Sequence, residues 1–360
     1  MIKKIFLIIY MMCVVITING CSKGTEENKN SSMHMDEKIK VDSKSKSGKE
    51  EITSNIDKGQ TENVKDIVYN FEYNPYVLSK DFLIKYGKGY VEFYKNFVDA
   101  YINYETSCPC PKEEYSYEVE FLTESNFLLF NVDVLPDYES IKYDKKTKTI
   151  HWKYESNTKI EHDNKIEEFE NQVASYMRCL QKGDTDFEKA IAIYGEFNSR
   201  MKYDKNVDDT SAYHALMIGT GKCTSFSAAY CHLLLQAGVD AITNGGFSKK
   251  SGGHRWNIVH LYGKDYFMDP TYEVGSKGSD GKGLLYFGMS KKEREEIGGF
   301  NLGTSQYGDV NGLEVEEYLD SDDRFSLFRS CIDYKLDRKH KCIVYYNKND
   351  NKPKKFYYEK

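Results

Sequence analysis

Two stretches of sequence decide the fold: GTGKCTSFSAAYCHLLLQAG at residues 219–238 and SGGHRWNIVHLYGKDYFMDPTY at residues 251–272. In the first, apolar residues recur at helical spacing from Thr224 until Gly238, so we expect a helix with Cys223 at its N-terminus. Unpaired backbone N–H groups at a helix N-terminus favour a thiolate over a thiol. A cysteine in this place can become nucleophilic, and the same N–H groups can stabilise an oxyanion.

The second stretch predicts a β-hairpin that brings a histidine and a carboxylate together. Residues 254–261 and 266–268 favour two strands, joined by a turn at Gly263. A residue at the end of the second strand returns toward the start of the first, so we expect Asp269 near His254. A carboxylate in that position fixes the imidazole tautomer and stabilises the charged form of the ring.

Three motifs therefore follow one another: Gly221-Lys222-Cys223, His254-Arg255-Trp256-Asn257 and Asp269-Pro270-Thr271. This order resembles the transglutaminase-like superfamily, whose core has Gly-x-Cys at a helix start, His-x-Trp-Asn on a strand and then Asp-Pro-Thr. The resemblance covers roughly residues 185–290 and implies an α+β, papain-like fold with the cysteine helix packed on an antiparallel sheet. It implies a catalytic triad, with Cys223 as nucleophile, His254 as base and Asp269 as the residue that orients the base.

The activity that the resemblance implies is thiol acyl chemistry on protein or peptide amides. Resolution by water would make a peptidase or amidase, and resolution by a lysine amine a crosslinking transglutaminase; the triad does not choose between them. One alternative is a non-catalytic module that uses the fold to bind cell-envelope or host proteins. Another is a scaffold stabilised by disulfides, which would require Cys223 to be bridged. No cofactor and no metal are expected, because the cysteines lack zinc-site spacing and Asp320-Ser321-Asp322-Asp323 lacks that of a calcium loop.

The first residues predict export and attachment to a membrane. Residues 1–20 have two lysines followed by an apolar run, which is the layout of a signal peptide, and the run is short for a membrane-spanning helix. Ile18-Asn19-Gly20-Cys21 resembles a bacterial lipobox, which implies a lipid on Cys21 that holds the chain at the extracytoplasmic face of the cell membrane. The alternative is an ordinary cleaved signal with Cys21 merely nearby.

Composition divides the remainder of the chain. Residues 21–66 are polar with almost no aromatic side chain, so we expect a lipidated, disordered tether. We expect three parts to follow: an accessory α+β region at 67–180, a catalytic domain at 181–300 and a C-terminal extension with a β-hairpin at 301–360.

The charge of the chain bears on its partners. The 56 acidic residues outnumber the 50 basic ones, which argues against nucleic acid as a partner. The expected partners are a protein or peptide substrate in the cell envelope or outside the cell, and the membrane through the N-terminal lipid.

The periodicity of apolar residues predicts further helices and strands, and the number of cysteines allows a disulfide. The expected elements are a helix at 81–104, strands at 115–121, 126–134 and 149–154, helices at 163–181 and 185–201 with Asp184 as a cap of the second, a helix near 289–297, and a strand pair at 341–347 and 354–360. Of nine cysteines, seven lie beyond the signal region; because seven is odd, at least one is unpaired in an exported protein. Cys331 and Cys342 could be bridged.

Overall fold

The computed structural model describes residues 69–116, 136–154, 158–209, 211–250, 252–276, 279–300, 302 and 320–359. The predicted signal peptide and tether lie outside the described residues, as does the predicted strand at 126–134. The predicted strand at 115–121 does so as well, apart from its first two residues. Among the helices that are described, none is long and apolar enough to cross a membrane.

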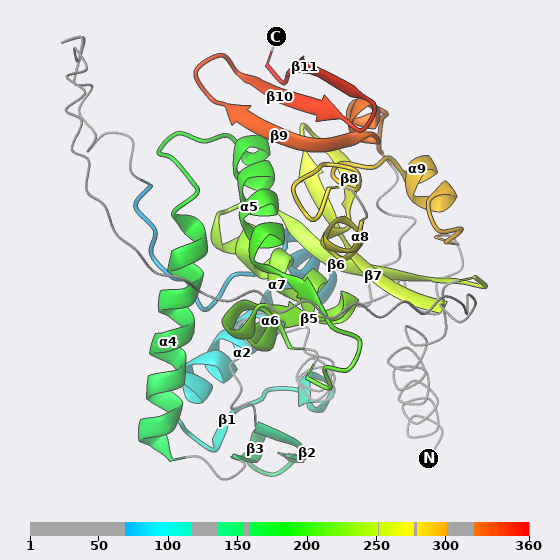
Figure 1. The fold of residues 1–360 in the computed structure, drawn as a ribbon. Helices are drawn as coiled ribbons and strands as arrows, with labels where there is room; N and C mark the ends of the chain where they lie inside the picture. Colours follow the sequence, from blue (N-terminus) through cyan, green and yellow to red (C-terminus); the bar gives the residue numbers. More distant parts are fainter. Residues whose placement is uncertain are drawn as a thin grey trace, which may run out of the picture.

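The helix α7 (Cys223–Gln236) lies at the centre of the molecule (Figure 1). Nearly all of its side chains are buried, which is typical of a core helix that is covered on every side. Gly238 follows it with a φ of 78°, a left-handed conformation that ends the helix as predicted. The helices α4 (Lys159–Met177), α5 (Asp186–Arg200) and α6 (Ala212–Ile218) pack around it.

Both long helices beside α7 begin at a capping box. Thr185 caps α5: its hydroxyl accepts a hydrogen bond from the Glu188 N–H, and the Glu188 side chain accepts one from the Thr185 N–H. The predicted cap, Asp184, is therefore wrong, because its carboxylate binds the Arg338 guanidinium instead. Thr158 caps α4 in the same way, and α4 consequently begins earlier than the spacing of its apolar residues predicts.

An antiparallel sheet covers another side of α7. It contains β6 (Ala241–Ser248), β7 (Gly252–Leu261) and β8 (Lys264–Met268), in the order β6-β7-β8. The predicted hairpin is confirmed, since β7 and β8 pair from Leu261 and Lys264 back to Asn257 and Met268.

The alternation of side chains in β7 separates two apolar clusters. Trp256 and Ile258 lie in a small cluster with Phe300 on one side of the sheet. Val259 and Leu261 lie in the main core on the other side. The chain then continues into two short helices, α8 (Pro270–Gly275) and α9 (Lys291–Glu296), the second of which confirms the predicted helix near 289–297.

The N-terminal part of the described chain contains α2 (Lys80–Ile102), β1 (Ser107–Pro109), β2 (Pro136–Asp144) and β3 (Thr149–Tyr154). The strands form an antiparallel sheet in the order β1-β3-β2, so the predicted strand at 149–154 is confirmed. The predicted helix is present but interrupted, because Gly87 has a φ of 72° that no helix allows. Two further short strands, β4 (Lys202–Tyr203) and β5 (Thr220–Gly221), pair in parallel just before α7.

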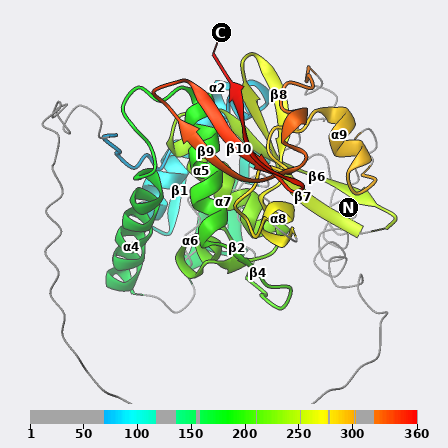
Figure 2. The same cartoon turned by 45° about the horizontal axis from the view of Figure 1, so that its top comes forward.

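The C-terminal sheet lies at the top of Figure 1, and Figure 2 shows β9 and β10 crossing over α5. Its strands β9 (Cys331–Asp337), β10 (Cys342–Asn347) and β11 (Asp350–Tyr357) are ordered β11-β10-β9. The predicted strand pair is confirmed, and β9 is an addition. Its apolar residues Ile332, Tyr334 and Leu336 alternate with charged ones, so the pattern of a half-buried strand was present in the sequence.

The register of this sheet excludes the possible bridge between Cys331 and Cys342. Cys331 lies opposite Asn347, and Cys342 lies opposite Asp337, so the two cysteines stand at opposite ends of the strand pair. Five residues of strand separate them by roughly 17 Å, whereas a disulfide requires Cα atoms within about 7 Å. None of the seven cysteines in the described part of the chain forms a disulfide.

Candidate active site

Cys223 is the first residue of α7 and is only 6% exposed. The turn before it is closed by Ser225, whose hydroxyl accepts a hydrogen bond from the Lys222 N–H at 2.9 Å and donates one to the Lys222 carbonyl at 3.1 Å. Gly221 is required here, because a Cβ would collide with that hydroxyl. The backbone is thus shaped so that Cys223 lies at the positive end of the helix.

His254 and Asp269 are in contact. Nε2 of His254 lies 2.7 Å from Oδ2 of Asp269, and the two residues are 6% and 0% exposed. His254 belongs to β7, whereas Asp269 directly follows β8 and caps α8 by accepting a hydrogen bond from the Tyr272 N–H at 3.0 Å. The hairpin therefore brings together the two residues that the sequence predicts to be neighbours.

The strand of His254 is held on the helix of Cys223 by one buried hydrogen bond. The Asn257 side chain donates to the Ser227 carbonyl at 2.8 Å. Ser227 lies about one turn beyond Cys223 along α7, and Asn257 lies three residues beyond His254 along β7. All three predicted site residues therefore belong to one packed unit of helix, strand and hairpin.

Arg294 is a buried member of this site that the sequence does not reveal. Its Nη1 donates to Oδ2 of Asp269 at 2.7 Å, and its Nη2 donates to the Ile297 carbonyl at 2.9 Å. Arg294 is fully buried, although it belongs to α9, whose sequence KKEREE is otherwise typical of a solvated surface. Nothing in that charged run distinguishes the one arginine that points inward.

Aromatic rings enclose the histidine and the arginine. The Tyr272 ring stacks on the His254 imidazole with centroids 4.3 Å apart and planes at 22°, and the Phe300 ring lies 5.5 Å away at 27°. The Arg294 guanidinium lies 4.6 Å from the Trp256 ring centroid and 4.7 Å from that of Phe300. These rings restrict the orientation of both side chains and keep water from the charged groups between them.

Asp269 is ionised in spite of its burial. Burial alone would raise the pKa of this carboxyl group, but the positive charge and hydrogen bond of His254 oppose it, together with Arg294 and the Tyr272 N–H. The net effect places the pKa of Asp269 below its ordinary value. A carboxylate is therefore available to orient the imidazole.

A second buried acid, Glu273, lies behind Asp269. Its carboxylate accepts hydrogen bonds from the Tyr286 N–H at 2.9 Å and the Ser279 hydroxyl at 3.1 Å. The Tyr194 hydroxyl lies 3.2 Å from this carboxylate and 3.3 Å from the Asp269 carbonyl oxygen. Burial raises the pKa of Glu273 to about 7, because these hydrogen bonds only partly offset the loss of hydration.

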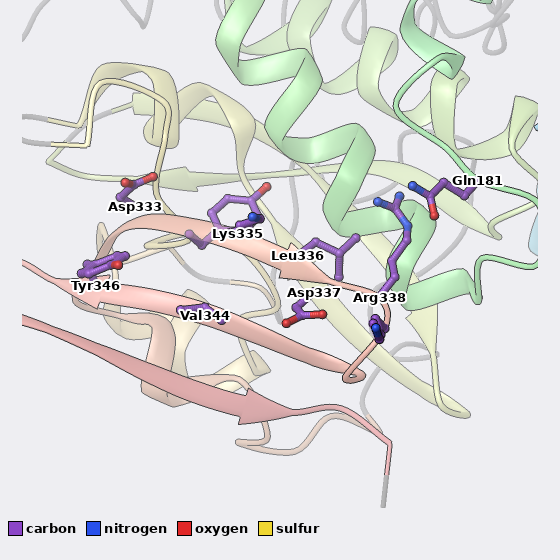
Figure 3. A pocket seen from close by; sticks show the side chains of 10 residues that line it. Gln181, Asp333, Lys335, Leu336, Asp337, Arg338, Val344 and Tyr346 are labelled. Carbon is purple, nitrogen blue, oxygen red and sulfur yellow. The ribbon is translucent and has the colours of Figure 1, made fainter. Parts of the chain in front are cut away.

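The C-terminal sheet has a hollow of its own, away from this site. A depression of about 650 Å³ runs along β9 and β10, and Figure 3 shows its lining side chains, which include Gln181, Lys335, Arg338 and Tyr346. None of the three predicted triad residues lines it. Within the described residues, no three His, Cys, Asp or Glu side chains lie close enough together to hold a metal ion.

A helix that starts with cysteine, packed on an antiparallel sheet with a histidine and aspartate on its hairpin, defines an α+β core. Residues 172–270 match the family model of the transglutaminase-like superfamily, so this part of the chain is a transglutaminase-like domain. Among curated proteins, none matches the chain.

Two solved structures are similar at 16% sequence identity. One, a candidate cysteine protease from Cytophaga hutchinsonii, has a TM-score of 0.26, with 28% of this chain and 37% of that protein covered. The other, described as a TGase, has a TM-score of 0.27, with 32% and 34% covered. The chain thus spans about a third of the length of each.

Proposed function

We propose that this chain is a cysteine-dependent enzyme that hydrolyses or transfers acyl groups at protein or peptide amides. Cys223 is the nucleophile, His254 the base and Asp269 the residue that orients the base. The observation that carries this proposal is the buried contact of 2.7 Å between His254 and Asp269, on the strand that packs against the helix starting with Cys223. A buried histidine with an ionised carboxylate partner suits proton transfer to and from a thiol.

The chemistry has two halves. Sγ of Cys223 attacks the amide carbon, and the carbonyl oxygen becomes an oxyanion that backbone N–H groups at the start of α7 can stabilise. The C–N bond then breaks, and His254 gives the proton taken from the thiol to the departing amine, which leaves a thioester. Water or a second amine attacks this thioester, the C–S bond breaks, and the proton returns through His254 to the thiolate.

In this proposal the enzyme acts outside the cell. The apolar run before Cys21 and the polar segment after it support export followed by lipid attachment at the membrane.

The proposal is tested by the pH dependence of iodoacetamide labelling at Cys223, followed by peptide mapping. A thiolate–imidazolium pair labels well below pH 7, and His254→Ala should abolish this low-pH reactivity. His260→Ala is the matched control, because His260 also contacts an aspartate of the same hairpin, with Nδ1 2.6 Å from Oδ1 of Asp265. In His260→Ala, Cys223 should label with the same pH dependence as in the unmodified protein.

Two outcomes would contradict the proposal: labelling of Cys223 no faster than that of an ordinary thiol, or a bridged Cys223. The first would favour the non-catalytic binding module, and the second the scaffold stabilised by disulfides. If the low-pH reactivity is found, a glutamine-containing peptide is incubated with and without a labelled primary amine. Mass spectrometry of the products then distinguishes amine incorporation, deamidation and peptide cleavage.

A further inference from the structure

Asp269 receives hydrogen bonds from two potentially cationic groups on a single oxygen. Oδ2 lies 2.7 Å from Nε2 of His254 and also accepts from Nη1 of Arg294 at 2.7 Å, while Oδ1 accepts from the Tyr272 N–H. A triad of cysteine, histidine and aspartate requires only the first of these contacts. The second charge is a separate feature of this chain.

We propose that Arg294 is a positioning residue of the triad: it fixes the Asp269 carboxylate against His254 and shifts the ionised thiolate–imidazolium pair to lower pH. This inference rests on the proposed function, because it assumes that Cys223 and His254 form such a pair. It adds a fourth residue, from outside the three motifs, to the groups that control the reaction.

The contacts of Arg294 show how it fixes the carboxylate. The guanidinium is held by the Ile297 carbonyl, 2.9 Å from Nη2, and lies against the rings of Trp256 and Phe300. A fully buried arginine is costly unless a carboxylate pairs with it, so Arg294 and Asp269 each require the other. The result is a carboxylate that cannot rotate away from His254 without breaking a buried ion pair.

Charge counting gives the effect on ionisation. With the thiolate and imidazolium both formed, Cys223, His254, Asp269 and Arg294 sum to zero; without Arg294 the same set carries one negative charge. Removing a positive charge makes a thiol harder to ionise and an imidazolium harder to deprotonate. Arg294 therefore moves both ionisation steps to lower pH.

Other titratable groups near Asp269 are accounted for in this argument. They are Tyr194 of α5, His254 of β7, Glu273 of α8, Tyr286 of the following loop and Arg294 of α9, with Arg329 acting on Glu273 and Tyr286. Tyr194 and Tyr286 stay neutral at the pH values of the experiment, because burial raises the pKa of both. Glu273 is the same in all the variants compared, so the difference between them reports Arg294.

The test is the labelling rate of Cys223 against pH in the full chain, with Arg294→Gln and Arg294→Lys. Glutamine keeps a donor for Asp269 but removes the charge; lysine keeps the charge but loses the planar fork of donors. In Arg294→Gln we expect both steps of the profile to move up by about 1 pH unit. In Arg294→Lys they should stay near those of the unmodified protein. Glu293→Gln is the control for disturbance of α9, since Glu293 binds Arg329 rather than Asp269.

Unmoved steps in a folded Arg294→Gln protein would overturn the role of Arg294 while leaving the proposed function intact. Absence of low-pH labelling in the unmodified protein would instead remove the proposed function itself. Should Arg294→Gln not fold, Arg294→Met replaces it, because an apolar side chain of similar length can pack against the rings of Trp256 and Phe300. Both steps should again move up, and unmoved steps would overturn the role of Arg294.

Discussion

The side-chain amide of Asn257 donates to the carbonyl of Ser227 across 2.8 Å, and thereby joins the histidine strand to the cysteine helix. Both residues are almost fully buried. Asn257→Ala would remove this buried hydrogen bond, which costs about 0.5 to 1.5 kcal/mol, while the Ser227 carbonyl stays within the backbone ladder of α7. We expect a corresponding loss in free energy of unfolding, measured in urea, and slower labelling of Cys223 at pH 6, because the two halves of the site separate.

Asn103→Ala is the matched control. Asn103 also donates its side-chain amide to a backbone carbonyl, that of Asp99 at 2.9 Å, but it is exposed and belongs to the N-terminal region. Its replacement should change neither measurement appreciably. Equal effects of the two variants would show that the contact between Asn257 and Ser227 has no special part in the site.

The raised pKa of Glu273 predicts that the free energy of unfolding falls as pH rises. Its pKa of about 7 in the folded chain exceeds the ordinary 4.5 of an unfolded chain, so the folded state binds its proton more tightly. The resulting stabilisation is complete below pH 4.5 and is lost as pH rises toward 7. Glu273→Gln should therefore match the unmodified protein near pH 5 and exceed its free energy of unfolding at pH 8 by about 3 kcal/mol.

Urea unfolding at intervals from pH 5 to pH 8 measures this difference. Asp269 titrates in the opposite sense, but only below its ordinary value of 3.8, outside this range. Glu168→Gln, a change at an exposed glutamate of α4, should leave the pH dependence unaltered. A pH dependence that persists unchanged in Glu273→Gln would refute the prediction.

Alkylation of the native protein should label Cys223 faster than Cys179 or Cys331. Burial raises the pKa of Cys179 and of Cys331 to about 12, so these thiols should label slowly in the native protein at pH 7. In unreduced, urea-unfolded protein all seven cysteines beyond the signal region should react, because none of them forms a disulfide in the described part of the chain. Counting alkylated cysteines by mass spectrometry checks both statements, and fewer than seven would reveal a bridge.

Cys21→Ala should release the protein from the membrane. Without the thiol no lipid can be attached, so the protein should leave the detergent phase on Triton X-114 partition and lose incorporation of labelled fatty acid. Cys13→Ala, a change within the apolar run, is the control and should remain lipidated. Retention of Cys21→Ala in the detergent phase would mean that something other than this cysteine anchors the chain.

Much of the fold could be predicted from local patterns. The helix beginning at Cys223, the hairpin of β7 and β8, and the approach of Asp269 to His254 all follow from periodicity, turn glycines and hairpin geometry, which involve neighbours along the chain. The cap of α5 was harder to predict, because Asp184 and Thr185 are both good capping residues. In the structure the Asp184 carboxylate binds Arg338 and the Gln181 N–H instead.

The sequence by itself determined the type of core and the three candidate residues, because helical and strand spacing and the order of the motifs are properties of nearby residues. Only the tertiary structure decided that Arg294 shares an oxygen of Asp269, that Tyr272 stacks on His254, and that the cysteines of the C-terminal sheet stand apart. These contacts depend on which face of a short charged helix turns inward and on strand register. Packing of the whole chain sets both, and no local pattern encodes them.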